Sequence, residues 1–224
     1  MKIYPLKFIK QHLFITLDGK DWLIDTGSPV TFGDIDSIEL MGQSFQVGNG
    51  AKGLNASAIS GYVGMEVAGL IGANILNQFD LVFDIAHGEL TFVDVDLELP
   101  GIVLELDECM GIPIVESVIA GNTFRMFFDT GAQISYLQDD CLSSFEHAGK
   151  CVDFYHGYGD FETDTYLIDC KLDGSSFNLR CGSLPETLGA SLMMANTTGI
   201  IGNEIMIDKV VGYFPKSGKM VISA

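Results

Sequence analysis

Alternating hydrophobic and polar residues along the chain predict short β-strands joined by tight turns. FITLDGKDWLID has two alternating runs around Asp18-Gly19, and SVIAGNTFRMFFD has two around Gly121-Asn122. Two-residue turns of this kind between such runs are typical of β-hairpins. The segments 37–47 and 169–179 show the same pattern, each around a central Gly. The pattern therefore predicts a mainly β protein.

Helical patterns are few and short. The sequence predicts one helix at 138–147 and two more directly after the Ile-Gly dipeptides, at 74–78 and 204–208. The segment LNASAISGYVG at 54–64 shows no amphipathic pattern, so no helix is predicted there. Because a dinucleotide-binding GxGxxG loop must open a helix within a βαβ unit, we interpret the GxGxxG at 48–53 as a glycine-rich loop.

Segments of the first half of the chain recur in the second half. LIDTGS (23–28) returns as FFDTGA (127–132), at an offset of 104 (127 − 23). The segment 70–92 aligns without gaps to 200–222, at an offset of 130 (200 − 70). Self-similarity of this kind indicates two copies of one structural unit.

The changing offset locates an insertion in the second copy. The predicted hairpins at 37–47 and 169–179 lie 132 positions apart, so the second copy has 28 extra residues (132 − 104) before its hairpin. The insertion lies within 133–168, and the overlapping segment CVDFYHGYGDFETDTYLIDC (151–170) predicts two further strands around a glycine-rich tip. The sequence thus predicts two lobes, 1–98 and 99–224, with the added hairpin in the second.

Composition argues against several kinds of partner. The 224 residues include 12 Lys and Arg against 30 Asp and Glu, a formal charge of −18, which disfavours nucleic acid. No apolar run of about 20 residues predicts a membrane span, and no signal peptide is recognised, so we expect no membrane partner and a cytoplasmic protein. The four His and five Cys show no metal-ligand spacing, so we expect no metal, no cofactor and reduced thiols.

The repeated motifs resemble those of the aspartic proteases of the pepsin and retropepsin type. In that family an apolar strand ends in Asp-Thr-Gly, and a later pair of apolar residues precedes a Gly. Here Leu70-Ile71-Gly72 follows the first Asp-Thr-Gly, and Ile200-Ile201-Gly202 follows the second. The resemblance covers about half of the chain. It implies a mainly β, two-lobed pepsin- or retropepsin-like fold with β-barrel lobes, pseudo-twofold symmetry and few short helices.

The resemblance also implies the catalytic groups. Asp25 and Asp129 would share one proton, so that one carboxyl acts as a base toward water and the other as an acid; the aspartic-protease dyad is itself the standard example of this effect. Ser28 follows the first Asp-Thr-Gly, whereas Ala132 follows the second. A Ser28 hydroxyl bonded to Asp25 would lower the pKa of that carboxyl, so we expect Asp25 to be the ionised base and Asp129 to hold the proton.

Supporting roles follow from the same resemblance. Thr26 and Thr130 would form hydrogen bonds across the lobe junction. Gly27 and Gly131 would leave room for backbone amides to approach the carboxylates. The glycines of the apolar-apolar-Gly segments would pack behind the two loops: Gly72 and Gly202.

The inserted hairpin is a candidate flap. In this family a hairpin folds over the bound peptide, and on that basis Gly157, Tyr158 and Gly159 are candidate substrate-binding residues. Pepsins carry the flap on the first lobe, which in this chain is too short for one. The alternative is an ordinary surface hairpin.

We therefore expect a monomeric aspartic endopeptidase, a hydrolase that cleaves extended peptides or proteins between largely apolar residues. A catalytically inactive pepsin-fold module that binds peptides or proteins is the main alternative, motivated by the missing first-lobe flap. A third possibility is a protein that processes only itself or one dedicated partner. The sequence contains no GxSxG and no Cys in a catalytic context, which argues against serine and cysteine hydrolases.

Overall fold

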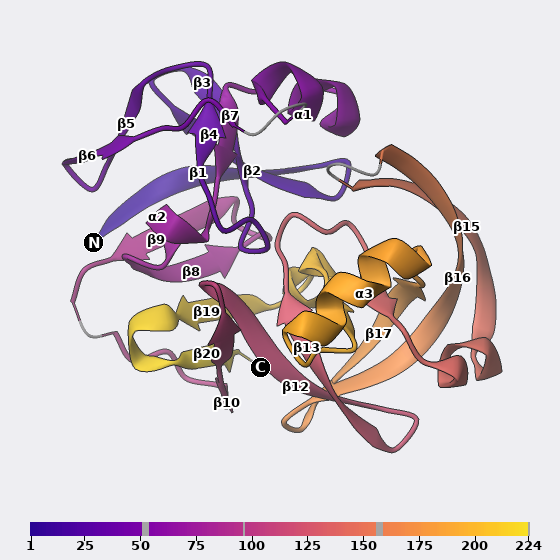
Figure 1. Ribbon diagram of the computed structural model, residues 1–224. Coiled ribbons are helices and arrows are strands. Elements are labelled where there is room, and N and C mark those ends of the chain that lie inside the picture. The colour runs from indigo at the N-terminus through magenta and orange to yellow at the C-terminus, as the bar shows by residue number, and fades with distance from the viewer. Residues whose placement is uncertain (51–53, 96, 156–158, 224) are drawn as a thin grey trace.

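The computed structural model describes residues 1–50, 54–95, 97–155 and 159–223, which form a mainly β protein of two lobes with few helices (Figure 1). The first half forms β1 (Lys2–Ile9), β2 (His12–Leu17), β3 (Lys20–Ile24), β4 (Phe32–Gly33), β5 (Ser37–Leu40), β6 (Gln43–Gln46), α1 (Ala56–Val63), β7 (Gly69–Ile71), α2 (Ala73–Leu76), β8 (Asp80–Asp84) and β9 (Glu89–Val93). The second half forms β10 (Ile102–Glu105), β11 (Asp107–Cys109), β12 (Ile112–Ile119), β13 (Asn122–Phe128), β14 (Ser135–Leu137), η1 (Asp140–Ser144), β15 (Glu146–Tyr155), β16 (Gly159–Leu172), β17 (Ser175–Gly182), α3 (Glu186–Met194), β18 (Gly199–Ile201), η2 (Asn203–Met206), β19 (Val210–Phe214), η3 (Pro215–Ser217) and β20 (Lys219–Ile222).

Two large sheets and one small hairpin contain the strands of the described residues. One sheet has the order β10-β20-β19-β8-β9-β1-β2-β3-β7-β4, the second has the order β11-β12-β13-β18-β14-β17-β16-β15, and β5 pairs with β6 alone. The first sheet passes from one half of the chain to the other where β8 pairs antiparallel with β19, with Val82 opposite Gly212. Backbone hydrogen bonds therefore join the two halves.

The same strand arrangement surrounds each repeated motif. β3 runs parallel to β7, with Leu23 opposite Leu70, and β13 runs parallel to β18, with Phe127 opposite Ile200. β4 and β14 lie antiparallel on the other side of β7 and β18. The internal repeat in the sequence is thus a repeat in three dimensions.

The predicted hairpins are present, with one turn shifted by a residue. Asp18 and Gly19 form the turn between β2 and β3, with φ values of 48° and 78°. In the second copy the turn is Ala120-Gly121, because Asn122 already pairs with Ile119. Left-handed backbone at both central residues matches the twist of the flanking strands, which explains the glycines at these positions.

Two helices were not predicted from the sequence. The prediction that 54–64 contains no helix was wrong, because α1 occupies part of it: the Asn55 side chain caps the Ala58 amide at 2.9 Å, and Gly64 ends the helix at a φ of 65°. Only Ala56, Ile59 and Val63 are buried, so the apolar face is too narrow to show as a pattern. β6 pairs with β5 in a separate sheet, so the described residues still show no βαβ unit at the GxGxxG.

The remaining helix predictions were correct in place but not in length. The helix predicted at 138–147 is the short 3₁₀ helix η1, and strand β15 begins directly after it. α2 and η2 follow the two Ile-Gly dipeptides, each starting one residue earlier than predicted. The other helix that was not predicted, α3, buries Leu188 and Leu192.

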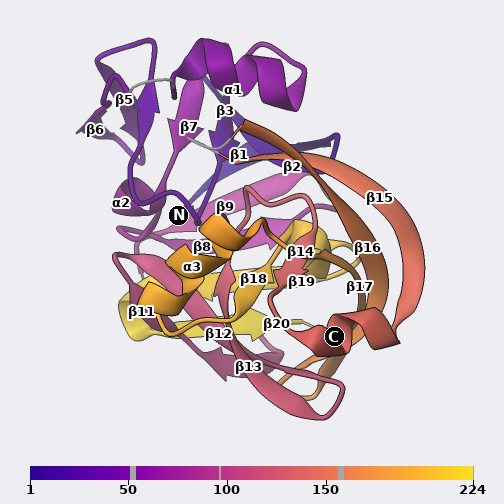
Figure 2. The ribbon, with the colours of Figure 1, turned by 45° about the vertical axis from the view of Figure 1, so that its right-hand side comes forward.

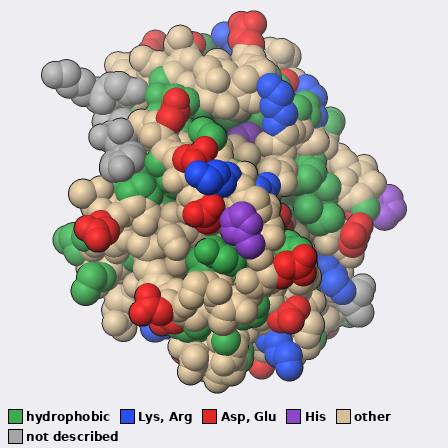
Figure 3. Space-filling view, turned by 90° about the vertical axis from the view of Figure 1, so that its right-hand side faces the viewer, with side chains coloured by type: hydrophobic (Ala, Val, Ile, Leu, Met, Phe, Trp, Pro, Cys, Tyr) green, Lys and Arg blue, Asp and Glu red, His purple; other side chains and the backbone are tan. Residues whose placement is uncertain are grey.

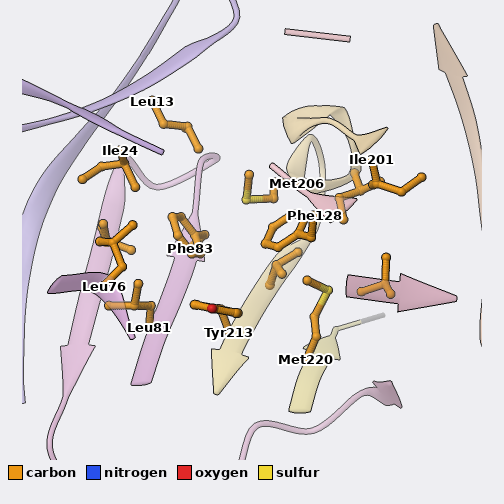
Figure 4. Close-up of a cluster of buried hydrophobic side chains, with 14 of the residues drawn as sticks. Leu13, Ile24, Leu76, Leu81, Phe83, Phe128, Ile201, Met206, Tyr213 and Met220 are labelled. Atoms are coloured by element: carbon orange, nitrogen blue, oxygen red, sulfur yellow. The ribbon is translucent and has the colours of Figure 1, made fainter. Parts of the chain in front are cut away.

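One cluster of buried hydrophobic side chains extends across both lobes. Figure 4 shows Leu81 and Phe83 of β8 beside Tyr213 of β19, with Phe128 of β13 packed further along the same cluster. The Phe128 and Tyr213 rings lie 6.2 Å apart. Because the core is continuous, the two lobes bury apolar surface against each other. The lobe boundaries 1–98 and 99–224 stay a prediction.

The surface carries charged groups of both signs. On the face in Figure 3, acidic and basic side chains are scattered singly or in small groups among hydrophobic ones. In the part of the chain that the structure describes, no helix combines the length and the apolar character needed to cross a membrane.

Candidate active site

The two Asp-Thr-Gly segments begin at the ends of parallel strand pairs. The Asp25 amide donates to the Ile71 carbonyl at 3.1 Å, and the Asp129 amide donates to the Ile201 carbonyl at 2.9 Å. Each aspartate is therefore the last residue held by a β-ladder before its loop turns. This places both carboxyl groups on rigid supports.

Thr26 and Thr130 connect the two loops by four hydrogen bonds. Each amide donates to the hydroxyl of the other threonine, both at 3.0 Å. The Thr26 hydroxyl donates to the Phe128 carbonyl at 2.8 Å, and the Thr130 hydroxyl donates to the Ile24 carbonyl at 2.9 Å. Both threonines are fully buried, so these bonds lie out of contact with water.

Gly27 and Gly131 each lie against the aspartate of the other lobe. A Cβ built on Gly27 would overlap the Asp129 carboxyl group, and one built on Gly131 would lie 2.6 Å from Asp25 Cγ. Real Cβ atoms do not approach so closely, so glycine is required at both positions. The two carboxyl groups therefore lie together at the junction of the lobes.

Backbone amides hold each carboxyl group. The Ser28 amide donates to Asp25 Oδ1 at 2.9 Å, and the Gly131 amide donates to Asp129 Oδ1 at 2.8 Å. Burial raises the pKa of both carboxyls, and for Asp25 the charge of Asp129 and a hydrogen bond with it raise the pKa further, well above its ordinary value. The pair therefore retains a proton at a pH where exposed aspartates are ionised.

The Ser28 hydroxyl does not contact the dyad. It donates to the Val30 carbonyl at 2.9 Å, and only the Ser28 backbone amide contacts Asp25. The expectation that this hydroxyl makes Asp25 the ionised base was wrong. The pKa of both carboxyls is raised and the two interact, so the proton belongs to the pair as a whole.

Gly72 and Gly202 lie directly behind the loops. A Cβ on Gly72 would lie 2.6 Å from the Ser28 carbonyl oxygen, and a Cβ on Gly202 would lie 2.9 Å from that of Ala132. The residues after them complete the contact, because the Ala73 and Asn203 amides donate to these same carbonyls.

Thr31 and Ser135 are supporting residues that the sequence analysis missed. The Gly72 amide donates to the Thr31 hydroxyl at 2.9 Å, and the Gly202 amide donates to the Ser135 hydroxyl at 3.1 Å. Both residues follow their aspartate by six positions, so the offset of 104 already matched two hydroxyl side chains. The residues next to Thr31 and Ser135 in the sequence do not indicate which backbone amide each hydroxyl contacts.

His12 of β2 lies beside the dyad and is nearly buried, with 7% of its surface exposed. Its Nε2 lies 3.0 Å from the amide nitrogen of Gln133 in the other lobe. A neutral imidazole can accept a hydrogen bond from this amide at Nε2. Burial lowers the pKa of His12 to about 4, and the nearby Lys10 contributes in the same direction.

A cleft of about 710 Å³ opens above the dyad, and both lobes line it. Its walls are mainly apolar, with Val30 and Ile59 from the first lobe and Phe161 and Leu184 from the second. Clefts of this size, apolar with a few convergent polar groups, are typical of ligand sites.

The inserted hairpin of β15 and β16 forms one wall of the cleft. Figure 2 shows these strands curving up from the second lobe towards α1 of the first. The Phe154 ring of β15 stacks on the Tyr62 ring of α1, at an interplanar angle of 17°. Of the candidate flap residues, Gly157 and Tyr158 lie outside the described residues, and Gly159 opposes Tyr155 at the start of β16.

The described residues hold no group of three or more His, Cys, Asp or Glu side chains suited to a metal ion. Comparison of the sequence with protein-family models and with curated proteins found no match to either. The resemblance to aspartic proteases therefore stays a prediction, supported by the geometry of the two loops.

Proposed function

We propose that the protein is an aspartic endopeptidase with a pepsin- or retropepsin-like fold. The observation that carries the proposal is the pairing of Asp25 and Asp129 across the lobe junction, at the floor of a cleft large enough for several peptide residues. A buried pair of acidic side chains destabilises a protein. Folding alone therefore does not explain why two loops bring their carboxyl groups together.

The arrangement fits the two proton transfers of peptide hydrolysis. The ionised carboxyl of the Asp25–Asp129 pair takes a proton from a water molecule, whose oxygen attacks the peptide carbonyl carbon, while the protonated carboxyl gives its proton to the carbonyl oxygen. Collapse of the tetrahedral intermediate breaks the C–N bond, and the first carboxyl returns a proton to the leaving nitrogen. The second carboxyl regains its proton as the carbonyl re-forms, so the pair ends as it began.

The surroundings support both the chemistry and the class of substrate. The cross-lobe threonine bonds keep the carboxyls in place without movement during the reaction, which is the condition for electrostatic preorganisation. The wall formed by β15 and β16 excludes water from one side of the cleft. The apolar lining fits hydrophobic side chains of an extended peptide.

A diverse peptide library, incubated from about pH 3 to pH 8 and analysed by mass spectrometry, tests the proposal. Wild type should cleave at defined sites, and Asp25→Asn and Asp129→Asn should not. Asp173→Asn is the matched control, because Asp173 is exposed in a turn with a φ of 41° that Asn tolerates. If wild type binds peptides but cleaves none, the binding-module alternative replaces the protease.

A further inference from the structure

A third carboxyl group, that of Asp153 on β15, lies in the wall of the cleft. It is partly buried and sits opposite Phe161 of β16 in the register of the hairpin. Burial raises the pKa of Asp153 itself, and when this carboxyl is ionised its charge adds to the burial that raises the pKa of Asp129. Asp153 is thus close enough to the dyad to meet a side chain of a bound peptide.

Neutral groups hold the Asp153 carboxyl. The Tyr136 hydroxyl donates to one of its oxygens, and the Phe154 amide donates to the other at 2.7 Å. Among the described residues no Lys, Arg or His forms an ion pair with it. Two nearby cations have other partners: Lys150 of β15 pairs with Glu162, and Arg180 of β17 bonds to Thr165 and backbone carbonyls.

The charged side chains that line the described part of the cleft are all acidic. Asp153 and Asp160 join the dyad there, and no Lys or Arg belongs to the lining. His12 supplies no positive charge near neutral pH, because its pKa is lowered to about 4. A buried charge is normally paired with an opposite charge. No such opposite charge lines the described part of this cleft, so a ligand can supply it.

We propose that Asp153 determines substrate specificity by pairing with a Lys or Arg side chain of the bound peptide. The inference rests on the proposed protease function and names the substrate class. The ammonium or guanidinium group meets the Asp153 carboxylate, while the methylene groups of the same side chain lie against Phe161 and Leu184, which line the same cleft. Tyr136 acts as a positioning residue, because its hydroxyl orients the carboxylate.

A purely structural role for Asp153 makes a different prediction. If the carboxyl only anchors β15 to Tyr136, its loss harms every substrate equally. If it binds a cation, its loss harms substrates with Lys or Arg at one position more than all others. The ratio of kcat/KM between two matched substrates separates the two roles.

The experiment uses peptide pairs that differ only in Lys or norleucine, scanned through each position around a mapped cleavage site. Norleucine has a side chain of similar length without the charge. At about pH 6 we expect wild type to prefer Lys at one position by about tenfold or more, the range for a charged hydrogen bond. Asp153→Asn should abolish this preference, measured as the ratio of kcat/KM between the two peptides, because the removed charge also acts on Asp129 and changes cleavage of both peptides alike. Tyr136→Phe should reduce the preference without abolishing it.

Two further outcomes separate this inference from the proposed function. Equal cleavage of both peptides, or a Lys preference that survives in Asp153→Asn, overturns the role of Asp153 and leaves the protease intact. If nothing is cleaved, calorimetry with non-cleavable reduced-bond versions of the same pairs tests the site directly. Tighter binding of the Lys peptide that Asp153→Asn abolishes supports the inference even then, and equal or absent binding overturns it.

Discussion

The Thr26 and Thr130 amides each donate to the hydroxyl of the other residue at 3.0 Å, although the two lie 104 positions apart in the chain. These reciprocal bonds connect the lobes directly beneath the dyad. They couple the stability of the protein to the geometry of the site.

Removing one of these hydroxyls should destabilise the protein strongly. Thr26→Val keeps the shape of the side chain but leaves the Thr130 amide and the Phe128 carbonyl without partners. We expect a loss of about 2–4 kcal/mol in the free energy of unfolding, measured by chemical denaturation. Thr26→Ser, which keeps the hydroxyl, should lose much less. A loss in Thr26→Ser as large as that in Thr26→Val would show that the methyl group matters as much as the hydrogen bonds.

Adding a methyl group at Gly131 should separate the carboxyls. The new Cβ would lie 2.6 Å from Asp25 Cγ, so Gly131→Ala must displace Asp25 or its loop. We expect peptide cleavage to fall by at least about 100-fold, as for other misplaced catalytic groups. The control is Gly61→Ala in α1, where a Cβ meets nothing within 4 Å. That variant should fold and be slightly more stable, because alanine favours helix. Since Gly61 lines the cleft, it controls for folding and not for cleavage.

Replacing Asp25 by Asn should stabilise the protein at neutral pH. The folded pKa of Asp25 lies well above the ordinary 3.8, so above about pH 4 the folded protein binds more protons than the unfolded chain. Stability from this group therefore falls as pH rises, and Asn removes the loss. The Tm of Asp25→Asn should exceed that of wild type at pH 7, with the gap closing near pH 3.5. A gap that is independent of pH would contradict the raised pKa.

His12 should make the protein less stable in acid. Its folded pKa of about 4 lies below the ordinary 6.5, so between these values the unfolded chain binds more protons and stability falls as pH drops. The full effect amounts to roughly 3 kcal/mol. Denaturation of wild type and His12→Leu at pH 7 and pH 4 measures it: the variant should lose less stability on acidification. Parallel losses would mean that His12 titrates normally.

The Tyr62–Phe154 stack should contribute to substrate turnover as a pair. Tyr62→Ala and Phe154→Ala each remove the contact between α1 and the inserted hairpin, so each should lower kcat/KM. The double variant should be little worse than either single one, with a coupling of about 0.5–1.5 kcal/mol. Effects that simply add would show that the two rings act independently.

The sequence was sufficient for features that depend on neighbouring residues. Asp18-Gly19 and Gly174 mark hairpin turns because left-handed backbone favours glycine, and that requirement is local. The repeated Asp-Thr-Gly and Ile-Gly segments located both aspartates, the glycines behind them and the inserted hairpin. The mainly β character followed from strand alternation alone.

Features that depend on distant contacts were decided by the tertiary structure. α1 has too narrow an apolar face to be seen in the sequence, and it is stabilised by packing against β-strands of the first lobe. The Ser28 hydroxyl could donate to the Asp25 carboxyl or to a backbone carbonyl. In the folded loop it donates to the Val30 carbonyl. Strand β8 pairs with β19, and the Tyr136 hydroxyl bonds to Asp153. The hydrophobic pattern of each segment does not indicate which distant segment it contacts. Hydrophobic periodicity specifies which face of an element is buried, whereas only the folded chain specifies against what.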